Sequence, residues 1–212
     1  MNRFEQELAD LKHRVLEMGT LAESMVTDSW HGIVRNDAAC LERVVANEPT
    51  LDRFQVDIDR EAVRLLTIFA PVARDLRFLL MIARITSELE RMGDHATDNC
   101  EYAGLIGDMH PSADLTELAD FVRRMVHDAM QAFTQEDRRQ AEAVMQLDAQ
   151  VDALYSQVFR DLLERAPDSS RTRSTGLILL ARSLERIADH ATNVCEEVFY
   201  LVEGADIRHQ TA

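Results

Sequence analysis

Glycine and proline are scarce in this chain, with 7 and 4 residues among 212. Both residues interrupt helices and build turns, so their scarcity predicts few turns and long helices. Cysteine is scarcer still: Cys40, Cys100 and Cys195 are an odd number and include no CxxC pair. This count argues against a disulfide framework and favours reduced thiols in a reducing compartment.

The chain also lacks the long hydrophobic stretches of membrane and exported proteins. No apolar run approaches the roughly 20 residues of a membrane-spanning helix, and the first residues, MNRFEQELADLKHR, lack the apolar centre of a signal peptide. Lys and Arg total 23 against 38 Asp and Glu, which gives a net charge of −15. This balance argues against nucleic acid and suits cation binding. We expect a cytoplasmic protein that has no nucleic-acid partner and meets a membrane only through partner proteins.

Common catalytic signatures are missing as well. The chain contains no GxxxxGKS or GxxxxGKT loop, no GxSxG turn and no HExxH helix. Each of these motifs supplies a phosphate cradle, a nucleophile or a metal ligand set to a large enzyme class. We therefore predict that the protein is not an enzyme.

Hydrophobic residues, at 46%, are sufficient for a core, and their spacing indicates helices throughout. Helices are expected over 3–34, 38–69 and 72–106, from about Leu115 to Phe133, around Leu147–Leu162, and over 171–202. Asp37 is a candidate cap, as is Ser169 or Ser170. Pro49 predicts a kink or break just before it, and Pro71 ends the second helix.

The predicted fold class is all-α, with two pseudo-symmetric three-helix bundles of six long helices. The loop MHPSAD separates a first repeat, 1–108, from a second, 113–205. The repeat is visible in the sequence, because LERMGDHATDNCE (89–101) returns as LERIADHATNVCE (184–196) with nine of thirteen positions identical. The long helical seams also favour a homodimer.

Each copy of the repeat carries two acidic residues at i, i+4, a spacing that places both carboxylates on one helix face. Chance alone gives about seven such pairs in a chain this acidic, and Asp57 with Glu61 is a candidate for one of them. The pairs in the repeat, however, have mirror partners. Glu90 and Asp94 lie 19 and 23 residues after Pro71, and Asp52 and Glu48 lie 19 and 23 before it.

The second half follows the same rule about a point between residues 168 and 169. Two hairpins are therefore each expected to bring four carboxylates together, and these are Glu48, Asp52, Glu90 and Asp94, then Asp148, Asp152, Glu185 and Asp189. Such oxygen ligands suit Fe, Mn, Mg or Zn ions, bridged in sites of two or more. Asp98 and Asn193 would extend the two sites by one turn. The alternative is a solvated acidic face balanced by Arg53, Arg91 and Arg186.

Three stretches carry a resemblance to a known family. They are FEQELADLKHRVLEMGTLAESMV, IFAPVARDLRFLLMIARITSELERMGDHATDNCEYA and LLARSLERIADHATNVCEEVFYLVEGADIRH. Together they resemble the PhoU family of phosphate-uptake regulators over nearly the whole chain. The resemblance implies two three-helix bundles and E(D)xxxD motifs that bind multinuclear metal clusters, which fall on the same eight carboxylates. Two departures are Pro49 inside the first motif and the absence of a second PVARDLR turn.

The resemblance also implies a non-enzymatic adaptor. Such a protein couples the ATPase subunit of a phosphate ABC transporter to a sensor histidine kinase, and restrains uptake and the starvation response when phosphate is plentiful. Arg74, Asp75 and Arg77 after the turn are candidates for a partner contact, or for capping and ion pairs within the first turn. The alternatives are a carboxylate-bridged iron store or redox protein, which normally uses Glu and His at i, i+3, and a scaffold without metal.

Overall fold

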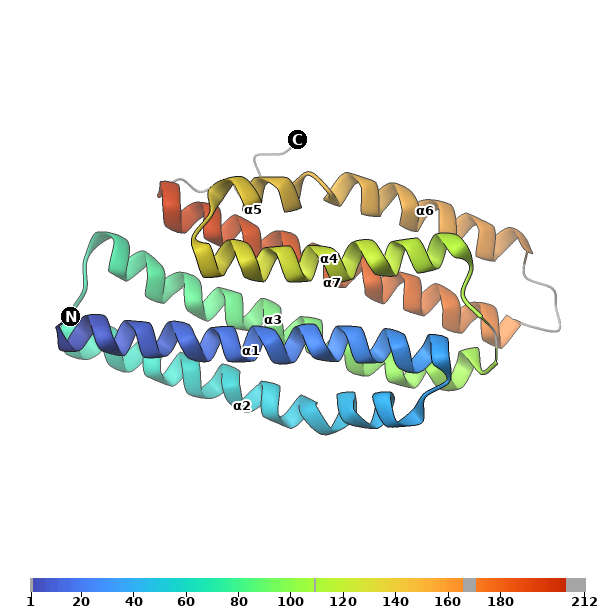
Figure 1. Ribbon diagram of the computed structural model, residues 1–212, viewed down its shortest axis with the longest axis horizontal. Helices are drawn as coiled ribbons and strands as arrows, with labels where there is room; N and C mark the ends of the chain where they lie inside the picture. The colour runs from blue at the N-terminus through green and yellow to red at the C-terminus, as the bar shows by residue number, and fades with distance from the viewer. Residues whose placement is uncertain (1, 109, 166–170, 205–212) are drawn as a thin grey trace.

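The computed structural model describes residues 2–108, 110–165 and 171–204, which form helices and contain no strand. The helices are α1 (Arg3–Arg35), α2 (Ala38–Phe69), α3 (Ala73–Ile106), α4 (Ala113–Gln135), α5 (Arg138–Met145), α6 (Asp148–Arg165) and α7 (Arg171–Glu203). They run roughly along the long axis of the molecule (Figure 1). The predicted all-α class is confirmed. Over the described residues, none of the helices has the length and apolar character needed to cross a bilayer.

Helix α1 begins and ends at residues whose chemistry fixes the chain there. The Asn2 side chain accepts a hydrogen bond from the Glu5 amide, and the Glu5 carboxylate accepts one from the Asn2 amide. Asn36 takes the left-handed conformation that ends the helix. The buried face of α1 follows the predicted apolar seam, including Leu11, Val15, Met18, Ala22 and Met25.

Helix α2 has the predicted bounds, and Asp37 caps it by accepting a hydrogen bond from the Ala39 amide. The predicted break before Pro49 is wrong, because α2 is continuous from Ala38 to Phe69. Proline leaves the carbonyl four residues earlier without its amide donor. That carbonyl belongs to Val45, which is exposed, so water can replace the missing donor.

The fifth helix expected around Leu147–Leu162 is α6, and the six expected long helices are α1, α2, α3, α4, α6 and α7. The short helix α5, which precedes α6, was not expected. The Leu147 amide donates to the Val144 carbonyl, three residues back, and the chain tightens into a turn between Met145 and Asp148. The proposed cap at Ser169 or Ser170 lies outside the described residues. Helix α7 begins at Arg171 as predicted, and Gly204, with a φ of +71°, follows its end.

Helices α3 and α7 lie side by side between the two halves and pack against each other more extensively than any other described pair (Figure 1). They run antiparallel, since Arg84 pairs with Glu197 and Ser183 donates to the His95 carbonyl. At Gly176 the helices approach so closely that a Cβ atom would lie 2.9 Å from Ile106 Cγ1. One hydrophobic core runs through both repeats, so they form a single packed unit.

Candidate metal centres

The hairpin of α2 and α3 assembles the first quartet, which we define as Glu48, Asp52, Glu90 and Asp94. Asp52, Glu90 and Asp94 each place a carboxylate oxygen within 4.8 Å of the other two. Glu48, one helical turn before Asp52, lines the same hollow as Asp94. The mirror register about Pro71 is therefore the observed one.

Electrostatics within the first quartet favour a cation. Burial raises the pKa of Glu48, Glu90 and Asp94, and repulsion from Asp52 raises each further. Arg91 opposes this effect at Glu90 and Asp94 without overcoming it. Among the described residues, no Lys or Arg forms an ion pair with a member of this quartet. Glu90 is half-buried and Asp52 and Asp94 are exposed. Three converging carboxylates without an ion-pair partner among the described residues are an environment that a hard divalent cation stabilises.

The second quartet, Asp148, Asp152, Glu185 and Asp189, is assembled by α6 and α7. Burial raises the pKa of Asp148, Glu185 and Asp189, and repulsion from Asp152 adds to it in all three. These carboxylates are therefore close enough to repel one another, but no three of them place oxygens within 4.8 Å of one another as the first quartet does. Two neighbours distinguish this quartet from the first: Thr192 donates a hydrogen bond to Asp148, and Arg186 lies 3.6 Å from both Glu185 and Asp189. The first quartet is therefore the better preformed cation site.

Replacing Asp189 by Asn is expected to stabilise the metal-free protein at pH 7. Burial, with repulsion from Glu185 and Asp148, raises the pKa of Asp189 to about 6, against about 3.9 in an unfolded chain. The folded state therefore holds this proton more tightly, and its charge opposes folding above pH 6. With the side chain 38% exposed, we expect a discounted gain of about 1 kcal/mol, or about 2–4 °C in Tm.

This gain has a defined pH window. It is largest at pH 7 and shrinks as the pH falls from about 6 to about 4, because the wild-type carboxyl then carries its own proton. Thermal unfolding in EDTA, followed by circular dichroism, measures it. Asp57→Asn, which removes a carboxylate that has arginine partners, is the control and gives no gain. A gain in Tm that is undiminished at pH 4 would show that it does not come from removing the charge of Asp189.

The acidic pair Asp57 and Glu61 shows how an ordinary surface pair differs from the quartets. Asp57 pairs with Arg60 and Arg14, and Glu61 pairs with Arg64. Counter-ions thus neutralise both carboxylates of this pair, as the reading of a solvated acidic face requires. Spacing alone does not separate such a pair from the first quartet, whereas the ion pairs found among the described residues do.

The two residues expected to extend the sites have different surroundings. Asp98 lines the hollow beside Asp94 and raises the pKa of Glu48 and Asp94, so it lies close enough to extend the first quartet. Asn193 instead donates its amide to Glu88 of α3, at 2.9 Å. The Asn193 amide therefore holds α7 against α3 rather than extending the second quartet.

Glu88 is a residue that sequence reasoning missed. Its carboxylate accepts from Asn193 and lies 2.7 Å from His190 Nδ1, and the His95 and His190 rings stack with centroids 5.5 Å apart. Burial works to raise the pKa of Glu88, but the contacts with His190 and Asn193 lower it on balance. The two histidines thus lie between the quartets. One sequence signal could have drawn attention to Glu88. At the position directly before the repeated motif, the first copy has Glu88 whereas the second has Ser183.

The candidate partner residues after Pro71 differ in their availability. Arg74 is exposed but pairs with Glu136. Arg77 is half-buried, with its guanidinium next to Gly204 at the end of α7. Asp75 is exposed in the first turn of α3, as its charge at a helix N-terminus favours.

The PhoU domain family matches this chain twice, over residues 15–103 and 115–198. Each match contains one copy of the repeat and one carboxylate quartet. The chain belongs to the PhoU family. The matched residues lie within the two repeats placed at 1–108 and 113–205.

PhoU proteins similar over most of their length are known by sequence and by structure. The PhoU homolog of Caulobacter vibrioides is 35% identical over 97% of this chain and 92% of its own, and PhoU of Serratia marcescens is 34% identical over 98% and 87%. The crystal structure of PhoU from Pseudomonas aeruginosa superposes with a TM-score of 0.91 at 32% identity over 96% of this chain and 100% of its own. These relatives are named phosphate-specific transport system accessory proteins. The PhoU family has this accessory, regulatory role and is not a known enzyme family.

Proposed function

We propose that this protein binds divalent or trivalent metal ions, such as Fe, Zn, Mn or Mg, through its two carboxylate quartets. We further propose that it acts as a negative regulator of phosphate uptake and of the phosphate-starvation response. The observation that carries the metal proposal is the first quartet, where three carboxylates from two helices converge within 4.8 Å and have no ion-pair partner in the part of the chain that the structure describes. Binding a cation there would relieve the repulsion that raises the pKa of Glu90 and Asp94.

The adaptor role is supported by family membership and by the shape of the molecule. The relatives are accessory proteins of phosphate-specific transport systems. A rigid unit of long helices offers extended surfaces to more than one protein at a time (Figure 1). We propose the transporter ATPase subunit and a sensor histidine kinase as partners, both reached from the cytoplasm, and a homodimer as the assembly.

The competing candidate, an iron store or redox protein, has little support. Helical carboxylate proteins of that class use a Glu and a His at i, i+3 on facing helices. In this chain His95 and His190 stack on each other between the quartets, and His190 contacts Glu88. A binding or structural site fits the geometry better than an oxidase centre.

A deletion strain tests the function. Grown in ample phosphate, it is expected to express alkaline phosphatase constitutively, and the wild-type gene should restore repression. The gene carrying Asp94→Ala and Asp189→Ala should fail to restore repression, because each quartet loses a central ligand. The gene carrying Asp57→Ala is the control and should restore it. Repression that survives deletion would contradict the regulatory role, and full rescue by the quartet variant would contradict the need for metal.

A further inference from the structure

Two adjoining hollows lie beside the α2–α3 hairpin, and the larger one is also lined by Arg186 and His190 of α7. The larger, of about 820 Å³, reaches from Glu48 and Asp94 to Asp98 and Glu101. The smaller, of about 470 Å³, lies between α2 and α3, and its lining residues are Leu41, Glu42, Val45, Ala46, Cys100 and Glu101. Val45 and Glu101 line both hollows, so the two form one continuous groove.

The smaller hollow is apolar at its floor. Leu41, Val45 and Ala46 contribute aliphatic surface, and Val45 is 49% exposed. The Cys100 thiol lies 3.4 Å from the Ala96 carbonyl oxygen and 3.7 Å from that of Leu41, and burial raises the pKa of the thiol to about 11, so it remains neutral. An exposed aliphatic floor in a defined hollow is a surface that a partner side chain buries favourably.

The rim of the groove is acidic. Its carboxylates belong to Glu42, Glu48, Asp94, Asp98 and Glu101. Arg91, Arg186, His95 and His190 also line the larger hollow, with His95 Nδ1 3.6 Å from Asp98 and Arg186 facing the second quartet. In the smaller hollow, by contrast, Glu42 and Glu101 are the only charged lining residues among those described, and both are acidic. The chain as a whole carries −15. A cationic side chain therefore gains attraction along the whole rim, whereas an anionic one is repelled.

We propose that this groove binds a cationic amphipathic segment of a partner protein. A Lys or Arg of the segment lies between Glu42 and Glu101, and an apolar side chain next to it fills the hollow formed by Leu41, Val45 and Ala46. This inference deepens the proposed adaptor role and rests on it for the existence of a partner. The recognition chemistry does not require a metal, because Glu42 and Glu101 lie outside the first quartet and outside its extension at Asp98.

The second repeat presents a different surface at the equivalent place. Cys195, the counterpart of Cys100, is fully buried, and Ala141, the counterpart of Leu41, is buried as well. Met145 replaces Val45 and is half-buried at the end of the short helix α5. A segment that fits the first groove therefore meets different chemistry in the second repeat, and we expect the partner to select the first.

Site-specific photocrosslinking in the cells that produce the protein tests this inference. A benzoylphenylalanine side chain at Val45 places the probe over the groove, and the same side chain at Val63 is the control. Val63 is also an exposed valine of α2, at 61%, but lies outside both hollows. Mass spectrometry of the adduct identifies the crosslinked partner peptide.

The expected adduct from Val45 is a segment with a net positive charge and apolar residues at i, i+3 or i+4. A synthetic peptide of that segment should bind the wild-type protein at least about ten times more tightly than the Glu101→Lys variant. Glu117→Lys makes the same charge change at an exposed position of α4 and should leave the affinity for the peptide within about twofold of the wild-type value. Circular dichroism confirms that both variants fold.

Several outcomes would overturn the proposal: no adduct, an adduct with a second copy of this chain, a neutral or acidic segment, or equal crosslinking from Val63. An equal loss of affinity in the Glu101→Lys and Glu117→Lys variants would also overturn it, since binding would then follow only the overall charge. The phosphatase reporter is measured separately. Repression that survives deletion of the gene, together with the expected adduct from Val45 in the producing strain, would therefore refute the regulatory function and leave the groove inference intact.

Discussion

Changing Glu90 to Gln and Asp94 to Asn is expected to weaken Mn²⁺ binding at the first quartet by on the order of 100-fold. The two side chains supply two of the three oxygen ligands that lie within 4.8 Å of one another. Gln and Asn keep the size and hydrogen-bonding capacity of the originals but remove two negative charges. A hard cation loses most of its electrostatic stabilisation when two carboxylates become amides. Isothermal titration with Mn²⁺ after EDTA treatment and dialysis measures the change.

The matched control is Asp57→Asn with Glu61→Gln, the other acidic i, i+4 pair of the first repeat. Its carboxylates already pair with Arg14, Arg60 and Arg64. We expect this control to leave Mn²⁺ affinity unchanged, because it removes the same charges from a place without a ligand set. An equal loss in both variants would show that Mn²⁺ responds only to the net charge of the chain, and an unchanged affinity in both would place the metal elsewhere.

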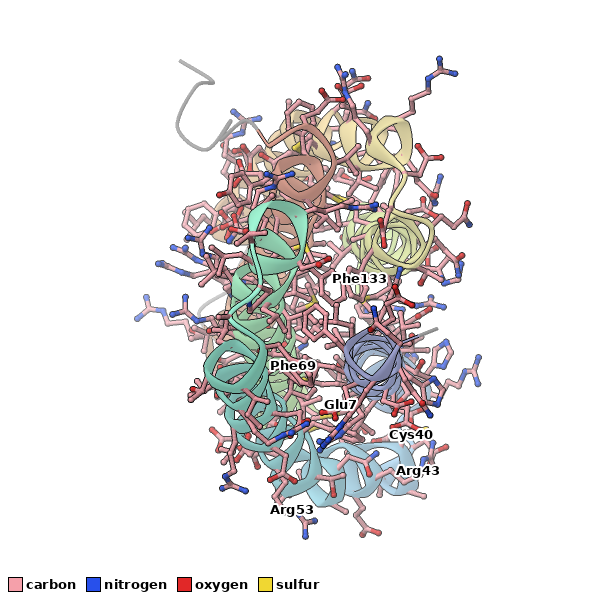
Figure 2. All side chains as sticks on the ribbon, turned by 90° about the vertical axis from the view of Figure 1, so that its left-hand side faces the viewer. Glu7, Cys40, Arg43, Arg53, Phe69 and Phe133 are labelled. Atoms are coloured by element: carbon pink, nitrogen blue, oxygen red, sulfur yellow. The ribbon has the colours of Figure 1, made fainter. Side chains whose placement is uncertain are left out.

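Phe133→Ala is expected to destabilise the protein by about 3–5 kcal/mol, or about 6–20 °C in Tm. Phe133 is fully buried near the end of α4 and points toward α1, with Lys12 Nζ 5.6 Å from the ring centroid (Figure 2). Truncation therefore leaves a cavity where the two repeats meet. Phe121→Ala on the same helix is the control. Phe121 is half-buried, so we expect a cost of about 1–2 kcal/mol.

The same variant tests whether the two repeats unfold together. Trp30, the one tryptophan of the chain, is buried in α1 and reports on the first repeat, whereas Phe133 belongs to the second. Because one core runs through both repeats, Trp30 fluorescence and far-ultraviolet circular dichroism should shift to the same lower midpoint. A Trp30 transition that stays at the wild-type temperature would mean that the repeats unfold independently.

Local sequence signals determined most of the helices and the carboxylate register. Helix α2 has the predicted bounds because Asp37 caps it and the residue before Pro71 leaves the helical conformation. Two straight helices that meet at a tight turn keep residues equally far from the turn at one level. Counting residues from Pro71 was therefore enough to bring Asp52 opposite Glu90, as the structure has it.

Only the tertiary structure decided how the repeats join and which carboxylates lack a counter-ion. The close packing of α3 and α7, with Glu88 between Asn193 and His190, depends on side chains about 100 residues apart, and no local periodicity encodes such pairs. Likewise, Asp57 with Glu61 and Glu90 with Asp94 share one spacing, yet among the described residues only the first pair forms ion pairs with arginines of its own and neighbouring helices. Spacing fixes which face of a helix a carboxylate is on, whereas packing decides which charges it meets there.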